Sequence, residues 1–436
     1  MQAVAARPQA FASQAVIGAV EVALRPLQLL MAFPALLFLV ALTAMLLCHP
    51  DVPSYGINRI AFGLLVLAVA ARIVILRDRL RVAERIALPM LALTGLTLAG
   101  VLGKPFDRET WSLLGTKYVV PFAMFYIAQL IFSTEKRFRQ FEAFTLCVLA
   151  YLSFTAIAFL LDARSFIFPK YILDPSLGYH VDRARGPFLQ AVANGVSLNM
   201  LGLLALHAYR RGSARGLKML ALLASVPLAI LATMTRAVWL SFAGSVLALI
   251  FLSKSSAIRR AGLWLSVVAV LALAAVGTSS DRSRAFSDRL TESSPVEFRQ
   301  AVYAGSWQMF LERPLTGWGF HSMPDELPRY VSEFRGEELY PHNTYLEVLV
   351  EQGMLGLALY IWLMWELLRL SRGTVPKAEQ NGFLDAEFNR FWPILLGVYW
   401  INAGLVVMNY QFVNALLFTL AGMLAAQRRR AEPAAC

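Results

Sequence analysis

The sequence predicts an all-α protein that crosses a membrane about twelve times. Of its 436 residues, 58% are hydrophobic and 16% are charged, and the mean hydropathy is +0.57. Soluble domains do not have this composition. Apolar runs of about 17 to 25 residues, the length that a bilayer core requires, occur along most of the chain. We place the spans near residues 27–48, 60–76, 86–102, 113–132, 143–161, 188–209, 217–234, 237–252, 262–277, 344–368, 391–409 and 410–427.

The positions of lysine and arginine indicate how these spans are oriented. If the spans alternate in direction, the basic clusters all fall on one side of the membrane, and the positive-inside rule makes that side the cytoplasm. The clusters lie at residues 77–85, 136–139, 210–218, 254–260 and 428–430. Both termini are then cytoplasmic. The net charge of +12 reflects this topology and contact with anionic membrane lipids, so we expect no nucleic-acid partner.

The chain divides into three parts. Residues 1–277 hold nine spans, preceded by an interfacial helix at 10–24. Residues 278–343 form a large outward loop, and residues 344–436 hold the last three spans and a short tail. Two outward loops, 162–187 and 278–343, are too long to be simple connectors, and we expect the functional residues there.

A helix is predicted within the larger outward loop. Residues 294–297 (SPVE) form a capping box with proline at the first helical position. One arginine and three aromatic residues follow at helical spacing: Arg299, Tyr303, Trp307 and Phe310. The pattern ends at residues 313–314 (RP). Such a stripe serves either to pack the helix or, because it includes Arg299, to contact a ligand.

A histidine lies where the tenth span begins. His342 is part of residues 340–347 (YPHNTYLE), which connect the large loop to that span. The positive end of the helix dipole disfavours the imidazolium form and keeps the ring able to accept a proton. His342 is therefore our candidate general base. The alternative is a helix cap or an anchor at the lipid headgroups.

Four arginines accompany His342 on the outward side. The apolar stretch 217–252 is too long for one span, so the chain must reverse near Arg236, and a charge at that depth is usually functional or paired. Arg183 and Arg185, two residues apart in an extended segment, point the same way. These three arginines and Arg299 suit recognition of phosphate, because one guanidinium group can bind two phosphate oxygens at once. The alternative for each is snorkelling to headgroups.

The outward loops lack the usual ligands of metals and nucleotides. They contain no Asp-x-Asp motif, no cluster of histidine and cysteine, and no glycine-rich phosphate loop. We therefore expect no metal and no cofactor. The competing possibility is a metal site built from the acids at 325–326 and 337–338, which we interpret as solvated loop surface.

Several short motifs recur in one family of membrane enzymes. They are RPLTGWG at 313–319, PHNTYLE at 341–347 and EQGMLG at 351–356, with RGPF at 185–188, Asn194 and TRA at 235–237 upstream. In these segments, confined to about residues 180–360, the chain resembles the O-antigen ligase superfamily.

The resemblance implies a GT-C-like bacterial inner-membrane enzyme with its active site facing the periplasm. Members of the family are similar to inverting, metal-independent glycosyltransferases that transfer O-antigen glycan from undecaprenyl pyrophosphate to lipid A-core. By the same resemblance His342 is the base, while Arg236 and Arg185 bind the pyrophosphate. We expect a monomer. The residues expected to contact the substrates are Arg183, Arg299, Asn194, Asn343 and Tyr340.

Two kinds of alternative remain open. Within the superfamily the acceptor differs, so the protein could be an O-antigen polymerase or a protein O-oligosaccharyltransferase; the short tail after the last span favours the ligase. Outside it, a transporter of lipid-linked sugars would suit the charges within the spans, at Lys117, Glu347, Glu351 and Glu366. Transporters usually carry matching halves, and residues 1–218 show no such match to 219–436.

Overall fold

The computed structural model describes residue 25 and residues 28–78, 84–277, 294–331, 339–372, 375 and 382–431. Within these residues the protein is helical and has no strand, which confirms the all-α prediction. The helix expected at 10–24 lies outside the described residues. The helices of the first half are α2 (Pro34–Leu47), α3 (Tyr55–Ile75), α4 (Glu84–Leu102), α5 (Arg108–Leu114), η1 (Gly115–Val119), α6 (Val120–Ile131), α7 (Glu135–Leu160), η2 (Arg164–Phe166), η3 (Lys170–Leu173), η4 (Gly186–Phe188) and α8 (Ala191–Arg211). Those of the second half are α9 (Leu217–Ala232), α10 (Arg236–Leu252), α11 (Ser256–Gly277), α13 (Ser294–Glu312), α14 (Met323–Glu326), η5 (Leu327–Arg329), α15 (Thr344–Arg369), η6 (Leu370–Arg372), α16 (Ala386–Ala403) and α17 (Gln411–Ala431).

The protein is a multi-pass membrane protein. In the described part of the chain, seven helices are long and apolar enough to cross a bilayer, and three shorter apolar helices, α2, α9 and α10, accompany them. The last two predicted spans correspond to α16 and α17. Each of the twelve predicted ranges therefore contains a helix, and the outward loop contains the predicted helix α13.

One end of the bundle gathers the basic clusters, and we call it the basic end. Arg211 at the end of α8 bonds Glu142 near the start of α7 (2.6 Å), and its neighbour Arg210 pairs with Asp385, which precedes α16. Arg428 in the last turn of α17 donates to the carbonyl of the last residue of α15 (3.2 Å). These contacts bring three clusters to one side, as alternating spans require.

The opposite end carries the candidate residues, and we call it the site end. There the Ala184 N–H, before α8, donates to Ala232 O at the end of α9 (3.1 Å). The Thr344 hydroxyl, at the start of α15, donates to Val406 O after α16 (3.0 Å). Segments far apart in sequence are therefore tied together at this end by hydrogen bonds that involve the backbone.

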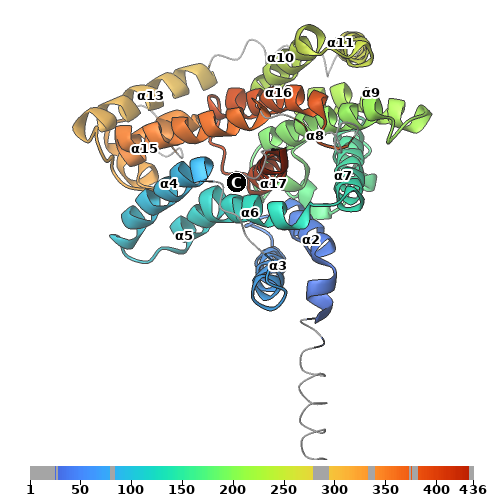
Figure 1. The fold of residues 1–436 in the computed structure, drawn as a ribbon. Helices are drawn as coiled ribbons and strands as arrows, with labels where there is room; N and C mark the ends of the chain where they lie inside the picture. Colours follow the sequence, from blue (N-terminus) through green and yellow to red (C-terminus); the bar gives the residue numbers. More distant parts are fainter. Residues whose placement is uncertain are drawn as a thin grey trace, which may run out of the picture.

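The centre of the bundle is formed by α8 and α17, with α3, α11 and α13 at the periphery (Figure 1). The apolar window of α8 is 89% buried, whereas that of α11 is 17% buried. A helix that is apolar on all sides and buried belongs to the core of a bundle, and one that exposes apolar side chains suits lipid.

The helix α15 is broken at Gly353. Gly353 has φ 67° and ψ −168°, a conformation that is nearly restricted to glycine. The segment 314–319 docks on this break. Four backbone hydrogen bonds join the two segments: Met354 N to Pro314 O (2.8 Å), Leu355 N to Leu315 O (3.3 Å), Trp318 N to Val350 O (3.0 Å) and Gly319 N to Glu351 O (2.8 Å).

We predict that Gly353→Ala destabilises the protein by about 1–3 kcal/mol. The added Cβ would need a strained backbone and would overlap with the carbonyl of Leu315. The matched control is Gly397→Ala in α16, where a Cβ meets nothing within 4 Å. Thermal unfolding of both variants in detergent checks the prediction. Equal midpoints for the two would contradict it.

Candidate active site

His342 lies at the entrance to α15 beside α13, which runs alongside α15 (Figure 1). Its backbone is in the left-handed region (φ 44°), and the half-buried imidazole lies 6.3 Å, centroid to centroid, from the ring of Phe298 on α13. The next residue, Asn343, caps the helix, since its Oδ1 accepts hydrogen bonds from the N–H groups of Tyr345 (3.0 Å) and Leu346 (3.2 Å). The cap and the ring of Phe298 together hold His342 in place.

The surroundings of His342 favour its neutral form. Burial lowers the pKa of His342 below the ordinary 6.5, and the positive charge of Arg299 on α13 lowers it further. The direction agrees with the expectation from the helix dipole, but the causes here are burial and Arg299. A neutral imidazole near pH 7 can accept a proton, as a general base must.

Packing of α13 explains why Arg299 lies beside His342. The buried side of the helix joins a small core with the loop after it and with α15; its members are Val302, Met309, Phe310, Met323, Leu327, Val331, Leu339 and Val350. Of the predicted aromatic stripe, Phe310 is buried and Tyr303 is half-buried, whereas Trp307 is 51% exposed. The stripe thus serves packing at Phe310 and Tyr303, and Arg299 lies one turn before Tyr303.

A buried ion pair joins η1 to α15, one turn beyond the Asn343 cap. Lys117 Nζ lies 2.5 Å from Glu347 Oε1, with side chains only 8% and 4% exposed. The Tyr340 hydroxyl donates to the same Oε1 (3.0 Å). Lys117 belongs to the π-helical turn η1 between α5 and α6. Such a turn is expected here, because Pro121 has no N–H to donate to the Lys117 carbonyl.

The loop after α13 fills the space between α15 and the start of α5. The Gly319 N–H of this loop donates to the backbone carbonyl of Glu351 on α15 (2.8 Å). The His321 Nε2 lies 3.8 Å from Glu109 Oε1, and Lys104 Nζ donates to Phe320 O (3.1 Å). Burial lowers the pKa of His321. The loop is therefore anchored on both sides.

Of the residues in this ion pair and loop, only Tyr340 was expected at the site from the sequence. Lys117 was noted only as a charge within a span, and Glu347 and Glu351 also as members of the motifs at 341–347 and 351–356, whereas His321 was not singled out. The available signal was Lys117 itself, since a lysine inside an apolar span needs a partner. Nothing in the sequence identified Glu347, 230 residues away, as that partner.

Arg185 is directed into the protein, and its expected contact with pyrophosphate stays a prediction. Its guanidinium donates to the carbonyls of Ile172 (2.8 Å), Asp174 and Leu177, and the residue is 1% exposed. The three donors in contact with carbonyls hold the 172–177 loop in its fold. Asn194 is likewise buried, and its Nδ2 donates to Ala184 O (2.8 Å). In this structure both residues shape the loop.

Arg183 and Arg236 lie on neighbouring segments, because the hydrogen bond from Ala184 to Ala232 joins the two turns that carry them. Arg236 is exposed at the first position of α10. Arg183 is half-buried, with its Nε 3.7 Å from the Asp182 carboxylate. Their predicted contact with a ligand on this side stays a prediction, as it does for Arg299.

The connection between α16 and α17 touches both groups of candidate residues. The Met408 N–H donates to the Thr344 hydroxyl at the start of α15 (2.9 Å). Directly after the connection, in the first turn of α17, the ring of Phe412 lies 5.8 Å from that of Phe188, the last residue of η4, which Arg185 precedes. The connection therefore forms a shared wall between the turn of His342 and the loop of Arg183 and Arg185.

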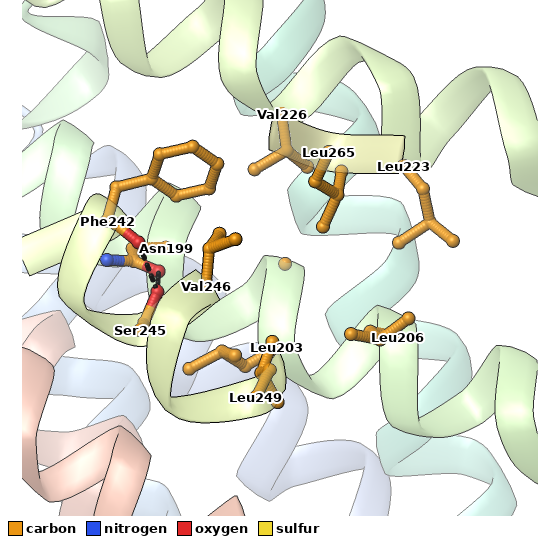
Figure 2. A pocket seen from close by; sticks show the side chains of 11 residues that line it. Asn199, Leu203, Leu206, Leu223, Val226, Phe242, Ser245, Val246, Leu249 and Leu265 are labelled. Carbon is orange, nitrogen blue, oxygen red and sulfur yellow. Dashed lines mark hydrogen bonds between the residues drawn. The ribbon is translucent and has the colours of Figure 1, made fainter. Parts of the chain in front are cut away.

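A small cavity among α8, α9, α10 and α11 is not a substrate site (Figure 2). Its walls are mostly leucine, valine and phenylalanine, and its polar members, Ser245 and Asn199, bond each other (3.1 Å). With a volume of about 10 Å³, it is no larger than the space that one water needs.

Comparison with known families assigns this region. Residues 219–361 match the family model described as O-antigen ligase. This range includes Arg236, Arg299 and His342 and the motifs at 313–319, 341–347 and 351–356. The match supports the O-antigen ligase superfamily, as the resemblance predicted. Arg183, Arg185 and Asn194 precede the matched range. A search of curated proteins with the chain finds no significant match.

We predict that Lys117→Met lowers the free energy of unfolding by about 3–5 kcal/mol, because it leaves the Glu347 carboxylate buried without its partner. The double variant Lys117→Met/Glu347→Gln should lose clearly less. As a control, Arg164→Met removes an exposed pair with Asp162 and should change stability by less than about 1 kcal/mol. Chemical unfolding in detergent measures all three. A double variant no more stable than Lys117→Met would contradict the pairing.

Proposed function

We propose that the protein is an O-antigen ligase of the bacterial inner membrane. It transfers the O-antigen glycan from undecaprenyl pyrophosphate to lipid A-core, with the site end facing the periplasm and both termini in the cytoplasm. The observation that supports this most is the turn of His342. A neutral imidazole, held by a capped helix beside an arginine, lies within the range that matches the ligase family.

In the proposed reaction, His342 accepts the proton of the acceptor hydroxyl as its oxygen attacks the anomeric carbon of the donor. The bond between that carbon and the pyrophosphate oxygen breaks, and undecaprenyl pyrophosphate leaves with the electron pair. One displacement inverts the anomeric centre. The positive charge of Arg299 disfavours the imidazolium, so the proton passes on after transfer and the base is restored.

In this scheme, arginines stabilise the negative charge that develops on the leaving pyrophosphate. Arg236 and Arg183 are the candidates, and Arg185 positions the loop that carries Arg183. Guanidinium groups can stabilise the developing charge without a metal ion. Of the four loop acids that offered a metal site instead, Glu326 pairs with Arg329 and Asp325 is exposed, while Glu337 and Glu338 lie outside the described residues.

An O-antigen polymerase is the second candidate, since a family match of this kind also fits it. The glycolipids of a deletion strain separate the two. Loss of a ligase leaves bare lipid A-core with free lipid-linked glycan, whereas loss of a polymerase leaves core that carries single repeats. The second outcome would refute the ligase proposal.

We predict that His342→Ala reduces transfer by about two to four orders of magnitude, the usual effect of losing a general base. The matched control is His180→Ala. His180 is also a histidine with positive φ (56°), is exposed in the other long loop and has no role in the scheme. It should retain transfer. Purified variants are compared with a lipid-linked donor and a lipid A-core acceptor, and near-normal turnover by His342→Ala would refute the assignment.

The pH dependence of transfer should reflect the lowered pKa of His342. Because its protonated form is disfavoured, activity should persist as the pH falls through 6.5, the ordinary histidine value, and decline only below it. Arg299→Gln removes one of the two causes, so the acid limb of kcat/KM should move up toward 6.5. A wild-type limb at or above 6.5 would contradict this electrostatic account.

A further inference from the structure

A separate pocket opens at the site end, between the turn after α2, the start of α3 and the start of α5. Its volume is about 380 Å³, within the range of small-ligand sites. The residues that line it are Pro50, Asp51, Val52, Pro53, Tyr55, Gly56, Arg59 and Arg108. None of them belongs to the proposed catalytic residues.

The pocket presents more positive than negative charge. Arg59 and Arg108 face one acid, Asp51, and within the described residues neither arginine has an ion pair. The acid that directly precedes Arg108 in the chain, Asp107, is engaged elsewhere. Asp107 caps α5, accepting from Thr110 N (2.8 Å) and Thr110 Oγ1 (2.6 Å), which lowers the pKa of Asp107.

One of the two guanidinium groups is held in place before any ligand arrives. Arg59 lies over the ring of Tyr55, 4.9 Å from its centroid, and the Tyr55 hydroxyl contacts Ser112 Oγ of α5 (3.2 Å). Stacking on an aromatic face leaves the N–H edges of an arginine available for a planar, two-pronged contact.

The surface next to the pocket suits hydrocarbon. The apolar window of α3 is only 33% buried. Exposed apolar side chains lie along this helix, before and after Arg59, at spacings of three or four residues: Ile57, Ile60, Leu64 and Leu67. A lipid whose headgroup occupied the pocket could lay its acyl chains on this stripe.

We infer that this pocket binds a phosphate group, and that a lipid headgroup supplies it. Two arginines that face one aspartate leave the pocket with a net positive charge, which attracts a phosphate group, and the exposed stripe of α3 suits the attached chains. The pocket also adjoins the candidate site. Glu109, which follows Arg108, lies 3.8 Å from His321 in the loop after α13. The inference does not depend on the proposed reaction.

Native mass spectrometry of the purified full-length protein tests this inference without turnover. The probes are dioleoylphosphatidic acid, a phosphate monoester, and dioleoylglycerol, which lacks phosphate, with inorganic phosphate as a competitor. Phosphatidic acid should bind, and Arg59→Gln/Arg108→Gln should weaken its binding by at least about tenfold, the effect of losing charge-assisted hydrogen bonds. The matched control is Arg164→Gln/Arg329→Gln, which removes two exposed arginines outside the pocket and should bind like the wild type.

Four other outcomes would overturn the phosphate site or the lipid as its source. Equal binding of dioleoylglycerol, or full binding by Arg59→Gln/Arg108→Gln, would overturn the phosphate site. An equal loss in the control variant would also overturn it, because general surface charge would then explain the binding. Displacement by inorganic phosphate at the same concentration would support the phosphate site and overturn the lipid as its source.

Discussion

The site end depends on one contact, the docking of residues 314–319 on the broken helix α15. At Gly353 the helix gives up its own hydrogen bonds, and the loop supplies backbone partners in their place. Inside a membrane protein such a break is tolerated only where other protein groups satisfy the freed amides and carbonyls. The docked loop in turn packs against α13 through Trp318, whose Nε1 donates to Met309 O (2.7 Å). Arg299 and His342 are thereby fixed on adjacent elements.

The charges at this end are arranged in two layers around the start of α15. The inner layer is the pair of Lys117 with Glu347, in which Tyr340 takes part, and it links α15 to the π turn of η1. The outer layer is His342 with Arg299, where burial and a like charge keep the imidazole neutral. The inner layer holds opposite charges together and stabilises the fold, whereas the outer layer favours the neutral form of the candidate base.

Much of the architecture could be predicted from the sequence, because span positions follow from apolar length and the start of α13 follows from its capping box. The position of the candidate base could also be predicted, since His342 precedes a long apolar helix. The role of Arg185 could not, because its partners are backbone carbonyls, which carry no sequence signal. The pair of Lys117 with Glu347 was equally hidden, because only the fold brings residues 230 positions apart together.

Product analysis with purified components tests the central claim most directly. The protein is incubated with undecaprenyl-pyrophosphate-linked glycan and lipid A-core in excess EDTA, and the products are identified by mass spectrometry and by the anomeric configuration of the new linkage. The account predicts glycan joined to lipid A-core with inverted configuration, together with released undecaprenyl pyrophosphate. Growth of the glycan on its lipid carrier, or activity that requires added magnesium or manganese, would contradict it.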